Sequence, residues 1–156
     1  MSPKEGPTRE GPFWDAMEGR TPPPPAAVTL GFKLLEIDPD RGTIRVQFEG
    51  KREFLNPMGV VQGGFVAAML DDTLGPALQC TLGANQFAPT LELKVNFVRP
   101  AKTGLLIAEG RVVARGGSIA FLAGELRTEG GELVATATAT ARIVVPRDGF
   151  AEGSSE

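Results

Sequence analysis

The residues best suited to chemistry lie in the segment 56–72. Gly63 and Gly64 open a predicted helix there, and glycines at a helix start leave backbone N–H donors unobstructed at its positive end, where they can hold a carbonyl oxygen or an anion. Asp71 follows Gln62 by nine residues, about two and a half helical turns, within an otherwise apolar stretch. An acid buried there without a partner is costly, so Asp71 needs either a partner or a function. Taken alone, the glycines are explained more simply by a tight loop and close helix packing.

Amino-acid types that are missing narrow the chemistry further. The chain contains neither histidine nor tyrosine. This excludes the serine–histidine–acid triad, the cysteine–histidine pair, the usual zinc hydrolase ligand sets and any histidine general base. If the protein is an enzyme working near neutral pH, its acid–base group is then a carboxylate or a lysine. The one cysteine, Cys80, allows no intrachain disulfide and no cysteine metal cluster, and no metal or redox cofactor is implied.

Length and composition predict one globular domain. The chain has 156 residues, of which 42% are hydrophobic and 22% charged, and a mass of 16.4 kDa. A formal net charge of -3 at pH 7 and a pI near 5.1 argue against a nucleic-acid partner, which would favour a basic surface. No stretch has the apolar length that spans a bilayer, and the first residues contain no apolar signal core. We therefore expect a soluble, cytoplasmic protein with no membrane partner.

The elements that position the candidate residues follow from apolar patterning and turn residues. Two strand-like runs, 31–37 and 43–48, predict a hairpin. The stretch 65–82 is apolar on nearly all sides and predicts a buried helix, which Pro76 should kink or end early because it cannot donate to the carbonyl of Asp72. Four further strands are expected at 90–98, 105–115, 119–128 and 133–145. This order predicts an α+β fold, with one helix laid against a curved antiparallel sheet.

The two ends of the chain differ in composition from this centre. Residues 1–27 hold many prolines, including the run 22–25, and form a predicted proline-rich N-terminal extension. Within it, Phe13–Met17 is either one helical turn packed on the domain or part of a flexible leader. We place the folded domain at 28–146 and a flexible polar tail at 147–156.

The segment 56–72 resembles a pattern of the PaaI-type acyl-CoA thioesterases, Asn-x-x-Gly-x-x-His-Gly-Gly followed by Asp nine residues beyond the histidine. The matching residues are Asn56, Gly59, Gln62, Gly63, Gly64 and Asp71. A second block, 90–101, resembles the strand that follows the helix in this family, with its Arg-Pro-Ala turn. Order and spacing extend the resemblance over about residues 30–145. It implies a hotdog fold, in which a curved antiparallel sheet wraps one long buried helix.

The resemblance also implies hydrolysis of an acyl-CoA thioester and roles for individual residues. The backbone N–H of Gly63 would stabilise the oxyanion, and Asp71 would act as general base on water or as nucleophile through a mixed anhydride. Asn56 would hold the water or the thioester, although a turn-starting role explains it equally well. Thr90 matches a position whose hydroxyl helps to place the water, and is otherwise an ordinary strand threonine. We assign the neighbouring Asp72 a structural role. If the alignment with the family motif is shifted by one residue, Asp72 takes the catalytic role and Asp71 the structural one.

Gln62 departs from the family pattern, which has histidine at this position. Glutamine donates and accepts hydrogen bonds but takes up no proton at working pH. In one hypothesis glutamine replaces histidine in bracing the loop or orienting the thioester, and the protein is a thioesterase for an aromatic or medium-chain acyl-CoA. In the other the chemistry needs the histidine charge, and the protein is a catalytically weak acyl-CoA-binding, sensing protein. A hotdog dehydratase is disfavoured, because the usual catalytic pair of that class includes histidine.

Binding of CoA requires cations near its phosphates. Candidates on or near the bordering strands are Lys94, Arg99 and Arg115, together with Gly64 at the helix start. CoA is part of the substrate, so no separate cofactor is expected. In the resembling family two protomers join their sheets and the site forms between them. We therefore expect a homo-oligomer, a dimer or a tetramer, with inter-subunit active sites.

Overall fold

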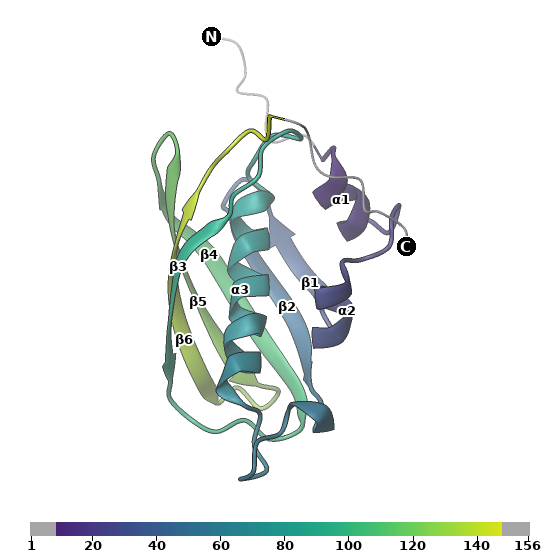
Figure 1. The fold of residues 1–156 in the computed structure, drawn as a ribbon, viewed down its shortest axis with the longest axis vertical. Helices are drawn as coiled ribbons and strands as arrows, with labels where there is room; N and C mark the ends of the chain where they lie inside the picture. Colours follow the sequence, from purple (N-terminus) through teal and green to yellow (C-terminus); the bar gives the residue numbers. More distant parts are fainter. Residues whose placement is uncertain (1–8, 148–156) are drawn as a thin grey trace.

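The computed structural model of the chain describes residues 9–147. One long helix, α3 (Gly63–Gln79), lies in the concave face of a six-stranded antiparallel sheet (Figure 1). The strands are β1 (Lys33–Asp38), β2 (Thr43–Gly50), β3 (Thr90–Phe97), β4 (Gly104–Arg115), β5 (Ile119–Thr128) and β6 (Leu133–Arg142). Their order across the sheet is β1-β2-β4-β5-β6-β3, so β1 and β3 form its edges. The predicted α+β arrangement is therefore confirmed.

The predicted hairpin is formed by β1 and β2. Asp38 closes its turn, because Oδ1 accepts hydrogen bonds from the backbone N–H groups of Asp40 at 3.0 Å and Arg41 at 3.2 Å. Gly42 follows with a φ of 64°, a left-handed conformation that glycine adopts without strain. Along β2, alternate side chains are buried in the core; these are Ile44, Val46 and Phe48. The strand β2 thereby joins the hairpin to the layer that faces α3.

Small residues on the sheet let α3 approach it closely. One face of β6 is made of buried alanines, which are Ala135, Ala137, Ala139 and Ala141. Two glycines extend this small surface onto β4 and β5. A Cβ added to Gly110 would lie 3.1 Å from Thr73 Cγ2, and one added to Gly124 would lie 2.9 Å from Leu74 Cδ2. The helix therefore packs where the sheet carries the least side-chain volume.

The helix α3 starts and ends earlier than the sequence predicted. It begins at Gly63 instead of residue 65, and it ends at Gln79 instead of residue 82. Pro76 lies inside it, and the backbone N–H of Cys80 still donates to the Pro76 carbonyl at 3.0 Å. Helical bonding thus resumes after the proline and stops within one turn. Pro76 therefore does not end α3 at its own position, and the helix stops three residues beyond it.

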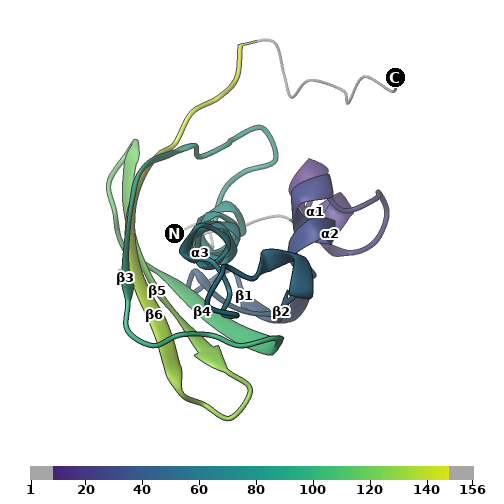
Figure 2. The ribbon, with the colours of Figure 1, turned by 60° about the horizontal axis from the view of Figure 1, so that its bottom comes forward.

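Two short helices lie beside α3, on the side away from β3 (Figures 1 and 2). The first is α1 (Pro12–Met17), which confirms the helical turn predicted at 13–17. Trp14 within it is 2% exposed, and its ring packs edge-on against Phe13 with centroids 5.2 Å apart. This part of the extension is therefore packed on the domain.

The second short helix, α2 (Pro25–Leu30), was not expected from the proline run that precedes it. Pro25 occupies its first turn, where the missing proline N–H breaks no helical hydrogen bond. Gly31 ends the helix with a φ of 72°. The domain boundary predicted after residue 27 falls inside α2. A short 3-10 helix, η1 (Arg52–Phe54), follows β2.

No helix among residues 9–147 is both long and apolar enough to cross a membrane. The predicted polar tail lies outside the described residues, apart from Arg147.

Candidate active site

Asp71 and Thr90 meet beside the middle of α3. Asp71 lies on the helix and Thr90 is the first residue of the edge strand β3, and both are exposed to solvent. The Thr90 hydroxyl donates a hydrogen bond to Asp71 Oδ1 over 3.1 Å. Among the described residues no other hydrogen bond or ion pair reaches this carboxylate. Its Oδ2 is therefore available to a water or a ligand.

The first turn of α3 presents the backbone donors expected of the glycine pair. Gln62 precedes the helix in an extended conformation, and its carbonyl accepts hydrogen bonds from the N–H groups of Phe65 at 2.9 Å and Val66 at 3.3 Å. The N–H groups of Gly63 and Gly64 come before the first intrahelical bond, and no acceptor in the described part of the chain meets them. The Gln62 side chain is exposed and forms no cap bond. The N–H groups of Gly63 and Gly64 and the side-chain NH₂ of Gln62 thus lie together as donors at the start of α3.

Phe97 covers the start of α3, a contact that the sequence did not indicate. A Cβ added to Gly63 would lie 3.1 Å from Phe97 Cε1 and 3.2 Å from Cζ, so an added methyl would require the ring to shift. Phe97 ends β3 and is 59% exposed. The available signal was its place in the second motif block, seven residues after Thr90 on the same strand. The strand β3 therefore runs along the site, from Thr90 beside Asp71 to Phe97 beside Gly63.

Asn56 holds the turn that precedes the helix. Its side-chain Oδ1 accepts hydrogen bonds from the backbone N–H groups of Met58 at 2.9 Å and Val60 at 3.3 Å. Gly59 within this turn has a φ of 75°. The side-chain oxygen is thus engaged in the turn, and a contact of Asn56 with a substrate would use its amide NH₂ group.

Asp72 lies about 100° around α3 from Asp71, beside residues of the N-terminal helices α1 and α2. Its Oδ2 is buried and receives no hydrogen bond from any described residue. Burial, and to a smaller extent the charge of Asp71, raise the pKa of Asp72 to about 7. The two neighbouring acids therefore differ in surroundings, with Asp71 solvent-accessible and hydrogen-bonded and Asp72 enclosed and unpaired.

The start of α3 and Asp71 do not meet within one chain. Asp71 follows Gly63 by eight residues, which is about 12 Å along a helix axis. A carbonyl carbon and its oxygen are only about 1.2 Å apart. One carbonyl group consequently cannot contact the Gly63 N–H and the Asp71 carboxylate of the same protomer.

The predicted CoA-binding cations do not form one cluster within the chain. Alternation along β3 places Lys94 on the face turned away from α3, because both of its neighbours pack against the core. Arg99 follows β3, and its Nη1 lies 4.0 Å from Glu132 Oε2. Arg115 lies beyond the other end of α3, where its Nη1 is 3.3 Å from Thr81 Oγ1. These three side chains border different parts of the surface.

Among residues 9–147, no three histidine, cysteine, aspartate or glutamate side chains are grouped as a metal site would require. Cys80 is fully buried, as expected of a small hydrophobe. Burial raises the pKa of its thiol to about 12, so at neutral pH Cys80 is a neutral core residue and not a thiolate.

Comparison with known proteins relates these features to a family. A profile described as Thioesterase superfamily matches residues 58–135, half of the chain. The matched range contains Gly63, Asp71 and Thr90. A protein of Saccharolobus solfataricus, named as a candidate esterase, is 30% identical over 108 residues, which cover 69% of this chain and 75% of that protein.

Solved structures share the arrangement of sheet and helix. A candidate thioesterase from Ralstonia eutropha, described as related to phenylacetic acid degradation, is 39% identical with a TM-score of 0.80, covering 83% of this chain and 98% of that chain. PaaI of Escherichia coli, from the phenylacetic acid degradation operon, has a TM-score of 0.75 at 19% identity, and the match covers 85% of this chain and 93% of that chain. A thioesterase of Haemophilus influenzae has a TM-score of 0.74 at 18% identity, and the match covers 94% of this chain and 96% of that chain. The last two show the fold alone, and together the three confirm the predicted hotdog fold.

Proposed function

Since the chain belongs to the thioesterase superfamily, we propose that it is an acyl-CoA thioesterase, which hydrolyses an acyl-CoA to the free acid and CoA. The observation that carries this proposal is the hydrogen bond from Thr90 to Asp71. It orients an exposed carboxylate through one oxygen and leaves the other for the reaction. In a chain without histidine, such a carboxylate is the group able to activate water near neutral pH.

The reaction runs through a negatively charged oxygen at the thioester carbonyl. With Asp71 as general base, Oδ2 takes a proton from water, the hydroxide oxygen bonds to the carbonyl carbon, and the carbon–sulfur bond then breaks. With Asp71 as nucleophile, Oδ2 bonds to the carbon, CoA leaves as the thiolate, and water hydrolyses the mixed anhydride. In both routes the Gly63 N–H stabilises the oxyanion, an interaction worth a few kcal/mol in the transition state. The Gln62 and Asn56 amides orient the thioester.

The active site is shared between two protomers. Because Gly63 and Asp71 of one chain are about 12 Å apart along α3, the oxyanion donor for Asp71 comes from a second chain. The edge strand β3 offers its outer backbone groups for pairing with another copy, and it carries exposed Leu91 and Phe97. We therefore propose a homodimer joined through β3, with dimers able to pair into tetramers.

The acyl group is aromatic or medium-chain. Phe97 supports this, because its exposed ring lies against Gly63, where the thioester carbonyl would bind. The similar protein from Ralstonia eutropha is described as related to phenylacetic acid degradation, which is consistent with an aromatic acyl group. On the CoA side, Gly64, Lys94, Arg99 and Arg115 remain the proposed phosphate contacts, divided between protomers.

A second candidate function is binding of acyl-CoA without efficient hydrolysis. Gln62 favours it, because glutamine stands where the family pattern has an ionisable histidine. Such a protein would bind CoA thioesters tightly and release little CoA.

The experiment that tests both functions is release of CoA from a panel of acyl-CoAs, aromatic through long-chain. Asp71→Asn keeps the size of the side chain and removes the base, so we expect turnover to fall roughly a hundredfold to ten-thousandfold. Asp40→Asn, in the exposed turn between β1 and β2, is the matched control and should leave turnover unchanged. Turnover that survives Asp71→Asn would contradict the assigned role. Binding of every thioester without release would establish the second function.

A further inference from the structure

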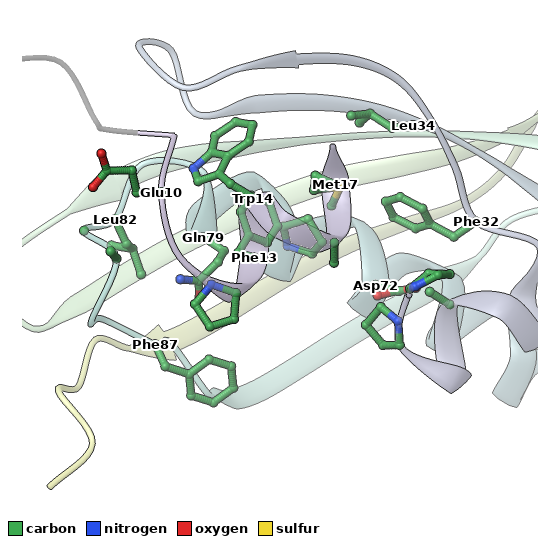
Figure 3. A pocket seen from close by; sticks show the side chains of 18 residues that line it. Glu10, Phe13, Trp14, Met17, Phe32, Leu34, Asp72, Gln79, Leu82 and Phe87 are labelled. Atoms are coloured by element: carbon green, nitrogen blue, oxygen red, sulfur yellow. The ribbon is translucent and has the colours of Figure 1, made fainter. Parts of the chain in front are cut away.

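A cavity of about 440 Å³ lies between the N-terminal helices and the side of α3 that faces away from β3. Its walls are mostly apolar, and the rings of Phe13, Trp14, Phe32 and Phe87 line it (Figure 3). A largely apolar cavity of this volume suits a small organic molecule. None of Gly63, Asp71 and Thr90 lines it.

Asp72 is an unpaired polar group in this wall. Figure 3 shows it with Phe32 toward one end of the cavity, while Glu10 and Leu82 lie toward the other. Its Oδ2 is shielded from solvent, and no described residue forms a hydrogen bond or an ion pair with its carboxyl group. A half-buried carboxyl without a partner is destabilising, and a ligand that pairs with it would remove that cost.

The charged side chains that line the cavity are all acidic. They are Asp72 and Glu10, and no lysine or arginine of the described residues lines the cavity. Gln79 also contributes, and its Nε2 donates to the carbonyl of Gln86 at 2.8 Å. Gln79 keeps its acceptor oxygen and its second N–H for a ligand. Aromatic faces, two acids and an amide oxygen together favour a ligand that is apolar and cationic.

We propose that this cavity binds a small apolar amine, whose protonated nitrogen pairs with Asp72 while its hydrocarbon body packs among the aromatic rings. A charge-assisted hydrogen bond to a carboxylate and contact with aromatic faces both favour a cation here. A free acid, or the phosphates of CoA, would meet two carboxyl groups and no base. An uncharged hydrocarbon would leave Asp72 unpaired. The site does not depend on the proposed thioesterase activity.

Titration of Asp72 gives amine binding a distinctive pH dependence. Its pKa is raised to about 7 by burial and by the charge of Asp71 on the same helix, and the other titratable group lining the cavity is Glu10. Below this pKa the carboxyl group is neutral and attracts a cation weakly, whereas above it the carboxylate attracts the cation strongly. A primary amine with a pKa near 10 stays protonated throughout. Amine affinity therefore increases roughly tenfold from about pH 6 to about pH 8, following the ionised fraction of Asp72.

Calorimetric titration of the full chain with phenylbutylamine, phenylbutanol and phenylbutyrate tests the proposal, because the three probes share one hydrocarbon skeleton. We expect the amine to bind most tightly at about pH 8, with the roughly tenfold gain over about pH 6. Asp72→Asn should remove that gain and leave binding of the alcohol unchanged. Ala16→Leu, which fills part of the cavity from α1, should weaken binding of the amine and of the alcohol at both pH values.

The opposite results would overturn the proposal. They are absence of amine binding to the native chain, an amine affinity that is the same at both pH values, or phenylbutyrate binding as tightly as the amine at about pH 8. If Asp72→Asn fails to fold, the native pH series and Ala16→Leu still decide the question. CoA release measured on the same samples keeps the two proposals separate. Asp71→Asn should lower turnover and leave amine binding in place, with the rise in affinity moved to lower pH because the Asp71 charge no longer raises the pKa of Asp72.

Discussion

The Thr90 hydroxyl donates a hydrogen bond to Asp71 Oδ1 over 3.1 Å, and this bond ties the first residue of the edge strand β3 to the middle of α3. Both residues are exposed, so the bond competes with water and persists because strand and helix are each fixed by the core. The carboxylate is thereby held through one oxygen. The position of the proposed base depends on a strand that is also expected to form the contact between protomers.

Thr90→Val should lower turnover roughly tenfold to a hundredfold. Valine keeps the branched shape of threonine but cannot donate, so Asp71 loses its orientation while the strand keeps its packing. Thr90→Ser retains the hydroxyl and is the matched control, with turnover close to native. The measurement is kcat/KM for CoA release. A loss in Thr90→Ser with native turnover in Thr90→Val would show that the methyl group, and not the hydroxyl, is what matters.

Gly63→Ala should lower turnover roughly tenfold to a hundredfold, whereas Gly64→Ala should be tolerated. The added methyl at residue 63 would press on the Phe97 ring at 3.1 Å and displace the proposed oxyanion donor, while the space beside Gly64 is open. The pair is matched in chemistry and in helix position. CoA release under identical conditions compares them. Adding Phe97→Leu to Gly63→Ala should recover part of the loss, and no recovery would mean that the methyl acts on the donor directly.

The resemblance to the family pattern pointed to Asp71, nine residues after Gln62, and to Thr90, and the structure joins the two by a hydrogen bond. The turn residues around Gly42 predicted the first hairpin, because short-range geometry decides such turns. The apolar content of the stretch 65–82 predicted a buried helix, although its ends shifted by two or three residues.

Contacts between segments that are distant in sequence could not be predicted. Phe97 and Gly63 are 34 residues apart, and their contact depends on how β3 passes the start of α3. The contrast between Asp71 and Asp72 depends on which side of the helix the N-terminal extension covers. The secondary structure of that extension was itself difficult to predict, because a proline run favours extended backbone while Pro25 also suits the first turn of a helix.

Asp72→Asn should raise the free energy of unfolding at about pH 8 and change it little at about pH 4. The pKa of Asp72 in the folded chain, about 7, lies above its ordinary value of 3.8. Stability from the protonated carboxyl is therefore complete below about pH 4 and is lost as pH rises toward 7. Asparagine stays neutral, so the gain at about pH 8 should be about 1–3 kcal/mol. Urea unfolding at the two pH values measures it, with Asp40→Asn as the exposed control. A gain of equal size at both pH values would contradict the ionisation argument.

Mixing two impaired variants, Asp71→Asn and Gly63→Ala, should restore activity if the site is shared between chains. A protomer with Asp71→Asn keeps its oxyanion donor, and a protomer with Gly63→Ala keeps its carboxylate. A mixed dimer then contains one site in which both groups are native. Random pairing makes half of the dimers mixed, with one of two sites restored, so co-expressed variants should reach about a quarter of native turnover. CoA release by the co-purified chains measures this, and light scattering of the same sample gives the oligomeric mass. Mixtures no more active than the two separate variants would place both groups in one chain's own site, and a mass equal to one chain would exclude the shared site altogether.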